Sequence, residues 1–174
     1  MTDRTASQNG PETTSTSIDD HAMAKLDTDS LLGLITDEYH AKHTEQLEEL
    51  HRLARKVEVV HREHADAPHG LTRLIKRFEQ EYLEHLERER EHVFAKMAGD
   101  QPPQPSTPIS QMITEHEVLN GILDEIRALT DGYRAPEGAC RSWQRLFNGL
   151  QDLDLSLTTQ VHLEQDVLYP RFQF

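Results

Sequence analysis

Cysteine is almost absent from this sequence of 174 residues, and long apolar runs are absent altogether. The single cysteine, Cys140, excludes an internal disulfide framework and a metal site built from several cysteines. Because no run of about 18 apolar residues occurs, the sequence predicts no membrane-spanning helix. The N-terminal segment also lacks the apolar stretch of a secretory signal, so we expect a cytoplasmic protein in a reducing environment.

Basic residues are scarce relative to acidic ones. The chain has 18 Lys and Arg against 31 Asp and Glu, which gives a net charge of −13. An acidic surface repels nucleic acid and anionic membranes, so neither is expected as a partner. Apolar residues make up 36% of the sequence, which is enough for one amphipathic core in a single domain.

Proline, glycine and Ser/Thr-rich stretches divide the chain. Residues 1–27 are rich in Ser and Thr, and this composition predicts a disordered tail before a domain over residues 28–174. Within the domain, four long segments without strand alternation are separated by short breaks. They span about residues 30–63, 71–98, 107–130 and 136–169. Amphipathic helices joined by short loops pack against each other antiparallel, so the predicted fold is all-α, an antiparallel up-and-down four-helix bundle.

Polar residues interrupt the apolar face of every predicted helix. Apolar residues recur on each helix at steps of three or four, as on the buried face of a bundle helix. The residues that break these faces are His40, His43, His61 and His64 on the first helix, His85 and Glu89 on the second, His116 on the third, and Gln160 and Glu164 on the fourth.

Two of these residues, Glu89 and Glu164, place a carboxylate at a core position. A buried carboxylate is costly unless it is paired or bound to a metal ion. His85 and Glu89 are four residues apart and therefore lie on the same helix face. Histidine and carboxylate together suit iron, zinc or manganese, and their inward projection from facing helices is the usual construction of a di-metal site. The sequence thus predicts a metal centre in which carboxylates bridge two cations and imidazoles cap them.

Position along the helices selects among the histidines of the first segment. His40 and His61 would lie about 31 Å apart on a continuous helix, so they cannot share one site. Antiparallel packing brings His40 to the level of His85 and Glu89, and His43 is expected to support the site one turn further on.

Simpler interpretations of the other residues stand beside the metal centre. A buried histidine such as His116, taken alone, is more often hydrogen-bonded structure than a metal ligand. His61 and His64 are expected at a helix end near the first loop, and Cys140 is interpreted as a small buried residue rather than a nucleophile. The prediction of a metal therefore rests on the coincidence that all four helices carry a ligand-type residue on the buried face.

Short motifs around these residues follow one another along the chain. They are Tyr39-His40-Ala41-Lys42-His43, Lys56-Val57-Glu58-Val59-Val60-His61, Glu84-His85 with Glu89, Thr114-Glu115-His116, Ala139-Cys140-Arg141-Ser142-Trp143 and Leu163-Glu164-Gln165-Asp166-Val167-Leu168-Tyr169-Pro170-Arg171. Over about residues 30–172 they resemble the hemerythrin-like domain of the di-iron proteins that repair iron–sulfur clusters.

This resemblance implies a hemerythrin-like bundle with a non-haem centre of two iron ions. It implies a cytoplasmic role in the recovery of iron–sulfur proteins from nitric oxide or oxidative damage. The expected partners are nitric oxide, oxygen species and damaged iron–sulfur proteins, to which the centre could also donate iron. The ligands implied by the motifs are His40, His85, Glu89, His116 and Glu164.

Two features depart from the family. The histidine that usually lies four residues before the last glutamate is replaced by Gln160, which could bind weakly through its carbonyl oxygen or leave one iron with an open position. His162 does not replace it, because it lies about 200° around the helix from Gln160. A register that pairs His162 with Asp166 would turn the apolar face from Trp143 to Leu157 out of the core. The family also commonly carries an N-terminal module with a cysteine pair, which this sequence lacks.

Three functions stay open at this point, and whether the protein is an enzyme is not decided by the sequence. The first is di-iron repair of iron–sulfur clusters. The second is a hemerythrin-like protein that senses or buffers oxygen, nitric oxide or iron without catalysis. The third is a metal-free bundle whose histidines form a structural network.

Overall fold

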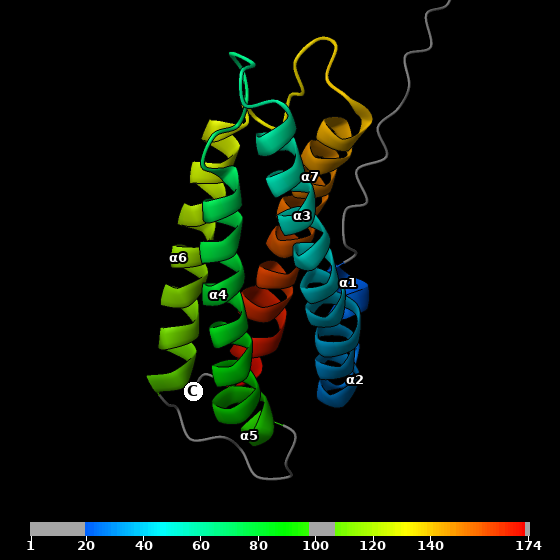
Figure 1. The fold of residues 1–174 in the computed structure, drawn as a ribbon. Helices are drawn as coiled ribbons and strands as arrows, with labels where there is room; N and C mark the ends of the chain where they lie inside the picture. The colour runs from blue at the N-terminus through cyan, green and yellow to red at the C-terminus, as the bar shows by residue number, and fades with distance from the viewer. Residues whose placement is uncertain (1–19, 98–106, 173–174) are drawn as a thin grey trace, which may run out of the picture.

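Four long helices, packed side by side, form the body of the protein (Figure 1). The computed structural model describes residues 20–97 and 107–172, and all regular structure within these ranges is helical. α3 packs against both α4 and α7, and α4 packs against α6, with successive long helices running in opposite directions. The predicted all-α antiparallel bundle is therefore confirmed. The long helices are α3 (Ala41–Val60), α4 (Leu71–Glu89), α6 (Thr107–Leu129) and α7 (Arg141–His162).

Shorter helical segments extend three of the long helices at one end of the bundle. The segments η1, η2 and η3 have the wider π-helical turn, and η4 has the tighter 3-10 turn. The extensions are α2 (Thr28–Gly33) and η1 (Leu34–His40) before α3, η2 (Arg90–Phe94) and α5 (Ala95–Met97) after α4, and η3 (Leu163–Leu168) and η4 (Tyr169–Phe172) after α7. No helix in the described part of the chain is both long and apolar enough to cross a membrane.

The structure moves two predicted boundaries. The fourth helix begins at Arg141 rather than near Pro136, because Gly138 has a φ of 78° and Cys140 is extended. The first begins at Thr28, where the Asp27 carboxylate caps it by accepting a hydrogen bond from the Ser30 amide at 2.7 Å.

The predicted disordered tail over residues 1–27 is partly ordered. Residues 1–19 lie outside the described residues, but α1 (Asp20–Met23) forms a short helix. Met23 and Leu26 pack against an apolar cluster of the bundle, and Arg171 donates a hydrogen bond to the Leu26 carbonyl at 3.0 Å. These apolar side chains give the end of the polar segment something to bury, so the folded part begins before residue 28.

The interior contains two apolar clusters along the bundle. The first core cluster joins α3, α4, α6 and α7 and includes Phe78, Leu119, Trp143 and Leu150. The second core cluster joins the extensions and the start of α6 and includes Leu31, Phe94, Met112 and Tyr169. Six buried polar residues lie in the sequence between the parts that build these two clusters: His40, His43, His85, Glu89, His116 and Gln160. Glu164 lies among residues of the second cluster, and the buried Thr130 and Asp154 lie among residues of the first.

Candidate metal centre

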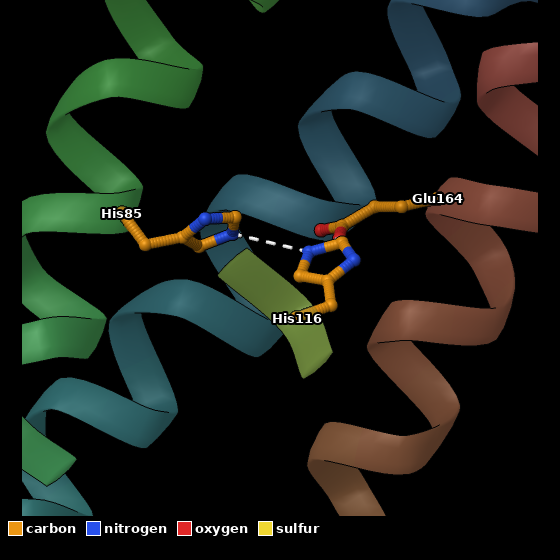
Figure 2. Close-up of side chains that lie close together, drawn as sticks. All are labelled: His85, His116 and Glu164. Atoms are coloured by element: carbon orange, nitrogen blue, oxygen red, sulfur yellow. Dashed lines mark hydrogen bonds and ion pairs between the residues drawn. The ribbon is translucent and has the colours of Figure 1, made fainter. Parts of the chain in front are cut away.

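Three of the buried polar side chains, from three different helices, meet between the two core clusters (Figure 2). His85 of α4, His116 of α6 and Glu164 of η3 point toward one another, and their ligand-type atoms all lie within 4.8 Å of each other. The two imidazole Nε2 atoms are 3.1 Å apart, and His116 Nε2 lies 3.0 Å from Glu164 Oε2. Because all three residues are buried, this first group is shielded from water.

A second group of ligand-type atoms shares Glu164 with the first. It consists of His40, Glu89 and Glu164. His40 Nε2 lies 3.4 Å from Glu164 Oε1 and 3.6 Å from Glu89 Oε2. Glu89 Oε2 is also 4.0 Å from His85 Nε2 of the first group. The two groups therefore adjoin, and the carboxylates lie between the imidazoles.

The π-helical turns help to place these residues. His40 is the last residue of η1, Glu89 directly precedes η2, and Glu164 lies within η3. The buried positions Ile35 and His40 are five residues apart, which is the step of a π turn and differs from the three-or-four step of an α-helical face. The three-or-four step of a regular α-helix does not predict this spacing.

Two carboxylate oxygens show that the site suits a cation. Glu89 Oε2 and Glu164 Oε2 are buried and have no hydrogen-bond partner among the described residues. The contact of Glu164 Oε2 with His116 is close but lacks the geometry of a hydrogen bond. An orphaned buried carboxylate oxygen is expensive without a counter-charge. Imidazole nitrogen and carboxylate oxygen are the donors that iron, zinc and manganese accept, so the residues present fit a metal ion.

The electrostatics set different protonation states for the two carboxylates of the site. Burial, together with the neighbouring Glu164, raises the pKa of Glu89 well above its usual range. Burial would also raise the pKa of Glu164, but the His116 and His40 imidazoles outweigh it and lower that pKa. Burial and the adjacent His116 lower the pKa of His85, which keeps this imidazole neutral at pH 7. Glu164 is thus ionised and His85 has a free lone pair, whereas Glu89 holds a proton that a bound cation would displace.

Glu115 orients His85, and the sequence analysis did not single it out. The His85 Nδ1 lies 2.9 Å from Glu115 Oε2, and Glu115 Oε1 accepts a hydrogen bond from Arg88 at 2.8 Å. A carboxylate that accepts the Nδ1 proton leaves Nε2 unprotonated and directed at the site, as is usual behind metal-binding histidines. Glu115 lies beside His116 but off the apolar face of its helix, so periodicity provides no signal for it.

Two further residues support ligand-type side chains from η3 and η4. Tyr169 donates its hydroxyl hydrogen to Glu89 Oε1 at 2.6 Å, and Gln165 lies 2.9 Å from His116 Nδ1. Neither was predicted. The signal for both is only their position near Glu164, in the last motif that the sequence analysis recognised.

Gln160 lies in the site with its amide nitrogen toward the ligand-type atoms. Gln160 Nε2 donates to Glu164 Oε1 at 2.9 Å and lies 3.0 Å from His40 Nε2. Its carbonyl oxygen instead accepts a hydrogen bond from the Tyr82 hydroxyl at 2.9 Å. In this orientation the carbonyl is turned away from the position where weak ligation was expected. His43 Nδ1 lies 2.9 Å from the Tyr82 hydroxyl, so His43 is connected to Gln160 through Tyr82.

The structure separates the other candidate residues from this site. His61 caps the C-terminus of α3, as expected, and its ring is tilted against that of Trp143 at 5.0 Å, while His64 is exposed. His162 and Asp166 lie 2.7 Å apart on the outside of the bundle, and Trp143 and Leu157 are buried. The register that would turn His162 and Asp166 inward is therefore excluded, as the sequence indicated. Cys140 is half-buried, not a core residue, because it precedes the first turn of α7, and its sulfur lies 3.1 Å from His61 Nε2.

Comparison with known proteins gives matches over most of the chain. A family model described as the hemerythrin HHE cation binding domain matches residues 34–172. The chain is 34% identical over 141 residues to the iron-sulfur cluster repair protein YtfE of Pectobacterium atrosepticum, and 35% identical over 142 residues to that of Yersinia pestis. These alignments cover 81% and 82% of this chain but only 64% of each relative. The chain therefore spans a little under two thirds of the length of these relatives.

Proposed function

Because the chain belongs to the hemerythrin HHE cation-binding domain family, we propose that it is a non-haem di-iron protein that takes part in the repair of iron–sulfur clusters damaged by nitric oxide or oxidative stress. The observation that carries the di-iron part is the pair of adjoining buried groups that share Glu164. The repair role is supported by the relatives, which are named as iron-sulfur cluster repair proteins. Such a role places its partners, damaged iron–sulfur proteins, in the cytoplasm.

Each buried group provides the ligands for one iron ion. His85 and His116 would hold the first with Glu164, and His40 and Glu89 would hold the second with Glu164. Glu164 belongs to both groups, which suits a bridging role. Glu89 lies within reach of His40 on one side and His85 on the other, at 3.6 and 4.0 Å, and suits a second bridge.

When bound, the iron pair supplies a redox-active centre for small ligands such as nitric oxide and oxygen species, or a source of iron for a damaged cluster. The residues of the chain prepare this centre. Glu115 directs the Nε2 lone pair of His85 inward, and Tyr169 holds Glu89. The apolar clusters on either side exclude bulk water, which strengthens the attraction between the carboxylates and a cation.

A second candidate function is sensing or buffering of oxygen, nitric oxide or iron without catalysis. Gln160 favours it, because an amide nitrogen lies where the family usually has a histidine ligand. A metal-free structural bundle is the third candidate. The two unpartnered carboxylate oxygens of Glu89 and Glu164 disfavour it, since a structural network would satisfy them.

Iron content tests the di-iron proposal. The protein, reconstituted anaerobically with ferrous iron and desalted, is expected to retain up to two iron ions per chain, with optical and Mössbauer spectra of a coupled pair. Glu89→Ala should abolish di-iron binding, and Gln160→His should tighten it. A matched control is Asp154→Asn, which changes another buried carboxylate that is already paired with Tyr133 and Arg127 and belongs to neither ligand group. Protein without stoichiometric iron would contradict the proposal.

Repair and buffering differ in their effect on a damaged enzyme. The iron-loaded protein is incubated with an iron–sulfur enzyme that nitric oxide has inactivated, and recovery of that enzyme's activity is measured. Recovery above that seen with the Glu89→Ala variant supports repair. Reversible binding of oxygen or nitric oxide without any recovery selects the sensing or buffering function instead.

A further inference from the structure

The Gln160 amide is bonded to atoms that one of the two cation positions would use as ligands. Its amide group has two hydrogens, and the nitrogen donates to Glu164 Oε1 at 2.9 Å and lies 3.0 Å from His40 Nε2, which is an acceptor in the tautomer that carries its proton on Nδ1. Both acceptors belong to the group formed by His40, Glu89 and Glu164. In the other group the imidazoles of His85 and His116 face each other and Glu164 Oε2, and Gln160 donates to none of these atoms.

The orientation of this amide is determined by its surroundings. Turning the amide over would put its carbonyl oxygen 2.9 Å from Glu164 Oε1, where two acceptors repel each other. It would also remove the acceptor of the Tyr82 hydroxyl hydrogen. Gln160 and Tyr82 are both 0% exposed, so water cannot replace the lost bond.

A chain of buried hydrogen bonds holds Tyr82 in turn. His43 Nδ1 lies 2.9 Å from the Tyr82 hydroxyl, and His43 Nε2 lies 2.8 Å from the hydroxyl of Ser156 on α7. When His43 donates its Nδ1 hydrogen to the Tyr82 oxygen, the hydroxyl hydrogen of Tyr82 is left to bond to the Gln160 carbonyl. The chain Ser156–His43–Tyr82–Gln160 therefore joins α3, α4 and α7 and fixes the amide nitrogen toward the site.

From this arrangement we infer that the two cation positions are unequal, and that Tyr82 makes them so by holding Gln160 as a hydrogen-bond donor. This inference rests on the proposed di-iron function. The position of His85, His116 and Glu164 fills first. The position of His40 and Glu89 fills second and weakly, because a cation there must displace both hydrogen bonds of the Gln160 amide.

The weak position is also the more accessible one. His40 is 9% exposed, whereas His85 and His116 are each 1% exposed. The amide that weakens this position also supplies a donor hydrogen to a small anionic or polarised ligand bound there.

A cobalt titration measures the inequality directly. Metal-free full-length protein is titrated anaerobically with Co²⁺, followed by optical absorption and by competition with a chromophoric chelator. The wild type is expected to show two binding steps. The dissociation constant of the second step should be at least about 10-fold larger than that of the first, which is the size of effect that a group next to a metal ligand usually has.

Two substitutions should reduce this difference. Gln160→Leu keeps a similar volume but removes the competing donor, and Tyr82→Phe releases the amide so that its carbonyl can turn toward the cation. Each should tighten the second step by about 10-fold and leave the first step almost unchanged. Circular dichroism checks the fold, and if Tyr82→Phe does not fold, Gln160→Leu still tests whether the Gln160 donor weakens the second position.

Gln165→Leu is the matched control. Gln165 also contacts a ligand-type histidine, but at His116 Nδ1, the nitrogen that faces away from the site. In this variant the ratio of the second dissociation constant to the first should be at least as large as in the wild type. A wild type that binds one cobalt, with a second gained in Gln160→Leu, supports the inference.

The results that overturn the inference differ from those that overturn the proposed function. Two equal steps in the wild type, or a ratio that neither Gln160→Leu nor Tyr82→Phe changes, would refute the role of Gln160 and leave the di-iron proposal intact. Absence of cobalt and iron binding in the wild type and in all variants would refute both.

Discussion

Two halves of one bundle treat buried acids differently. The half around the first core cluster is built from regular α-helix and mostly apolar side chains, and its buried acid, Asp154, is paired through one oxygen. Asp154 Oδ2 accepts hydrogen bonds from the Tyr133 hydroxyl at 2.7 Å and from Arg127 at 2.6 Å. In the other half, next to the π-helical turns, Glu89 Oε2 is fully buried and has no hydrogen-bond partner among the described residues.

The difference shows how to distinguish a structural buried acid from a ligand. Both carboxylates are buried, so burial alone does not separate them. The unpartnered oxygen does, because a fold that only needed stability would pair it or replace it. On this basis, the half that contains Asp154 determines stability and the half that contains Glu89 determines cation binding. Four predictions test that division, beginning with the largest expected effect.

Trp143→Ala should separate stability from metal binding most clearly. Trp143 is 1% exposed in the first core cluster, and truncation of a buried tryptophan costs about 3–5 kcal/mol. We expect this loss in the free energy of unfolding measured with urea, and an unchanged number of iron ions per folded chain. Loss of iron from the folded Trp143→Ala variant would show that the two halves are not independent.

Acid should destabilise the metal-free protein through the site half. Burial, with a smaller effect from His40, lowers the pKa of His43 to about 4. The unfolded chain takes up this proton near pH 6.5, so stability is full above that pH and falls as the pH drops toward 4. The loss is on the order of 3 kcal/mol at 1.4 kcal/mol per pKa unit.

The variant His43→Gln tests this assignment. Glutamine does not titrate and can still bond to Tyr82 and Ser156, so unfolding free energy should depend less steeply on pH between 6.5 and 4. His69→Gln, at an exposed loop position, serves as the control and should keep the wild-type slope. An identical slope in His43→Gln would assign the acid sensitivity to other groups.

The two buried acids should respond with opposite signs when each is made neutral. Glu89→Gln should raise the stability of the metal-free protein at pH 7. The raised pKa of Glu89 means that the folded protein keeps a proton at pH values where the unfolded chain has lost it. The unsubstituted protein therefore loses stability as the pH rises above the ordinary pKa of glutamate, and Glu89→Gln removes this loss. Asp154→Asn should instead lower stability by about 1–2 kcal/mol, because Tyr133 and Arg127 lose a charged acceptor.

Thermal unfolding with and without iron measures both effects. Iron should stabilise the wild type and Asp154→Asn, since a ligand that binds only the folded state must do so, but not Glu89→Gln. Equal destabilisation by both substitutions in the metal-free state would remove the distinction between a structural acid and a ligand.

The smallest expected effect compares two helical glycines. A Cβ atom at Gly149 of α7 would lie 2.9 Å from Leu50 Cδ2 on α3, whereas one at Gly121 of α6 meets no described atom within 4 Å. Gly121→Ala should stabilise the protein by up to about 1 kcal/mol through helix propensity. Gly149→Ala should gain less or lose stability, because Leu50 must move. Equal gains in melting temperature would show that the contact between α3 and α7 is loosely packed.

The sequence alone was enough to identify the helices and most of the candidate site. Periodicity is a local property, and a charged or imidazole side chain on an apolar face stands out whatever the neighbouring helix is. This is why His85, Glu89, His116 and Glu164 could be chosen in advance, and why the position of His40, rather than His61, followed from helix length. Whether these residues bind iron is still a prediction.

Tertiary structure alone decided how those residues are held. Glu115 reaches His85 from another helix, Tyr82 turns the Gln160 amide, and a π-helical step brings Ile35 and His40 onto one face. Each of these depends on the rotation and depth at which two helices meet, and no single helix encodes that in its own pattern of apolar residues. The pattern of apolar residues therefore determined which side chains face the interior, but only the packing of the helices determined which nitrogen or oxygen atom each side chain presents there.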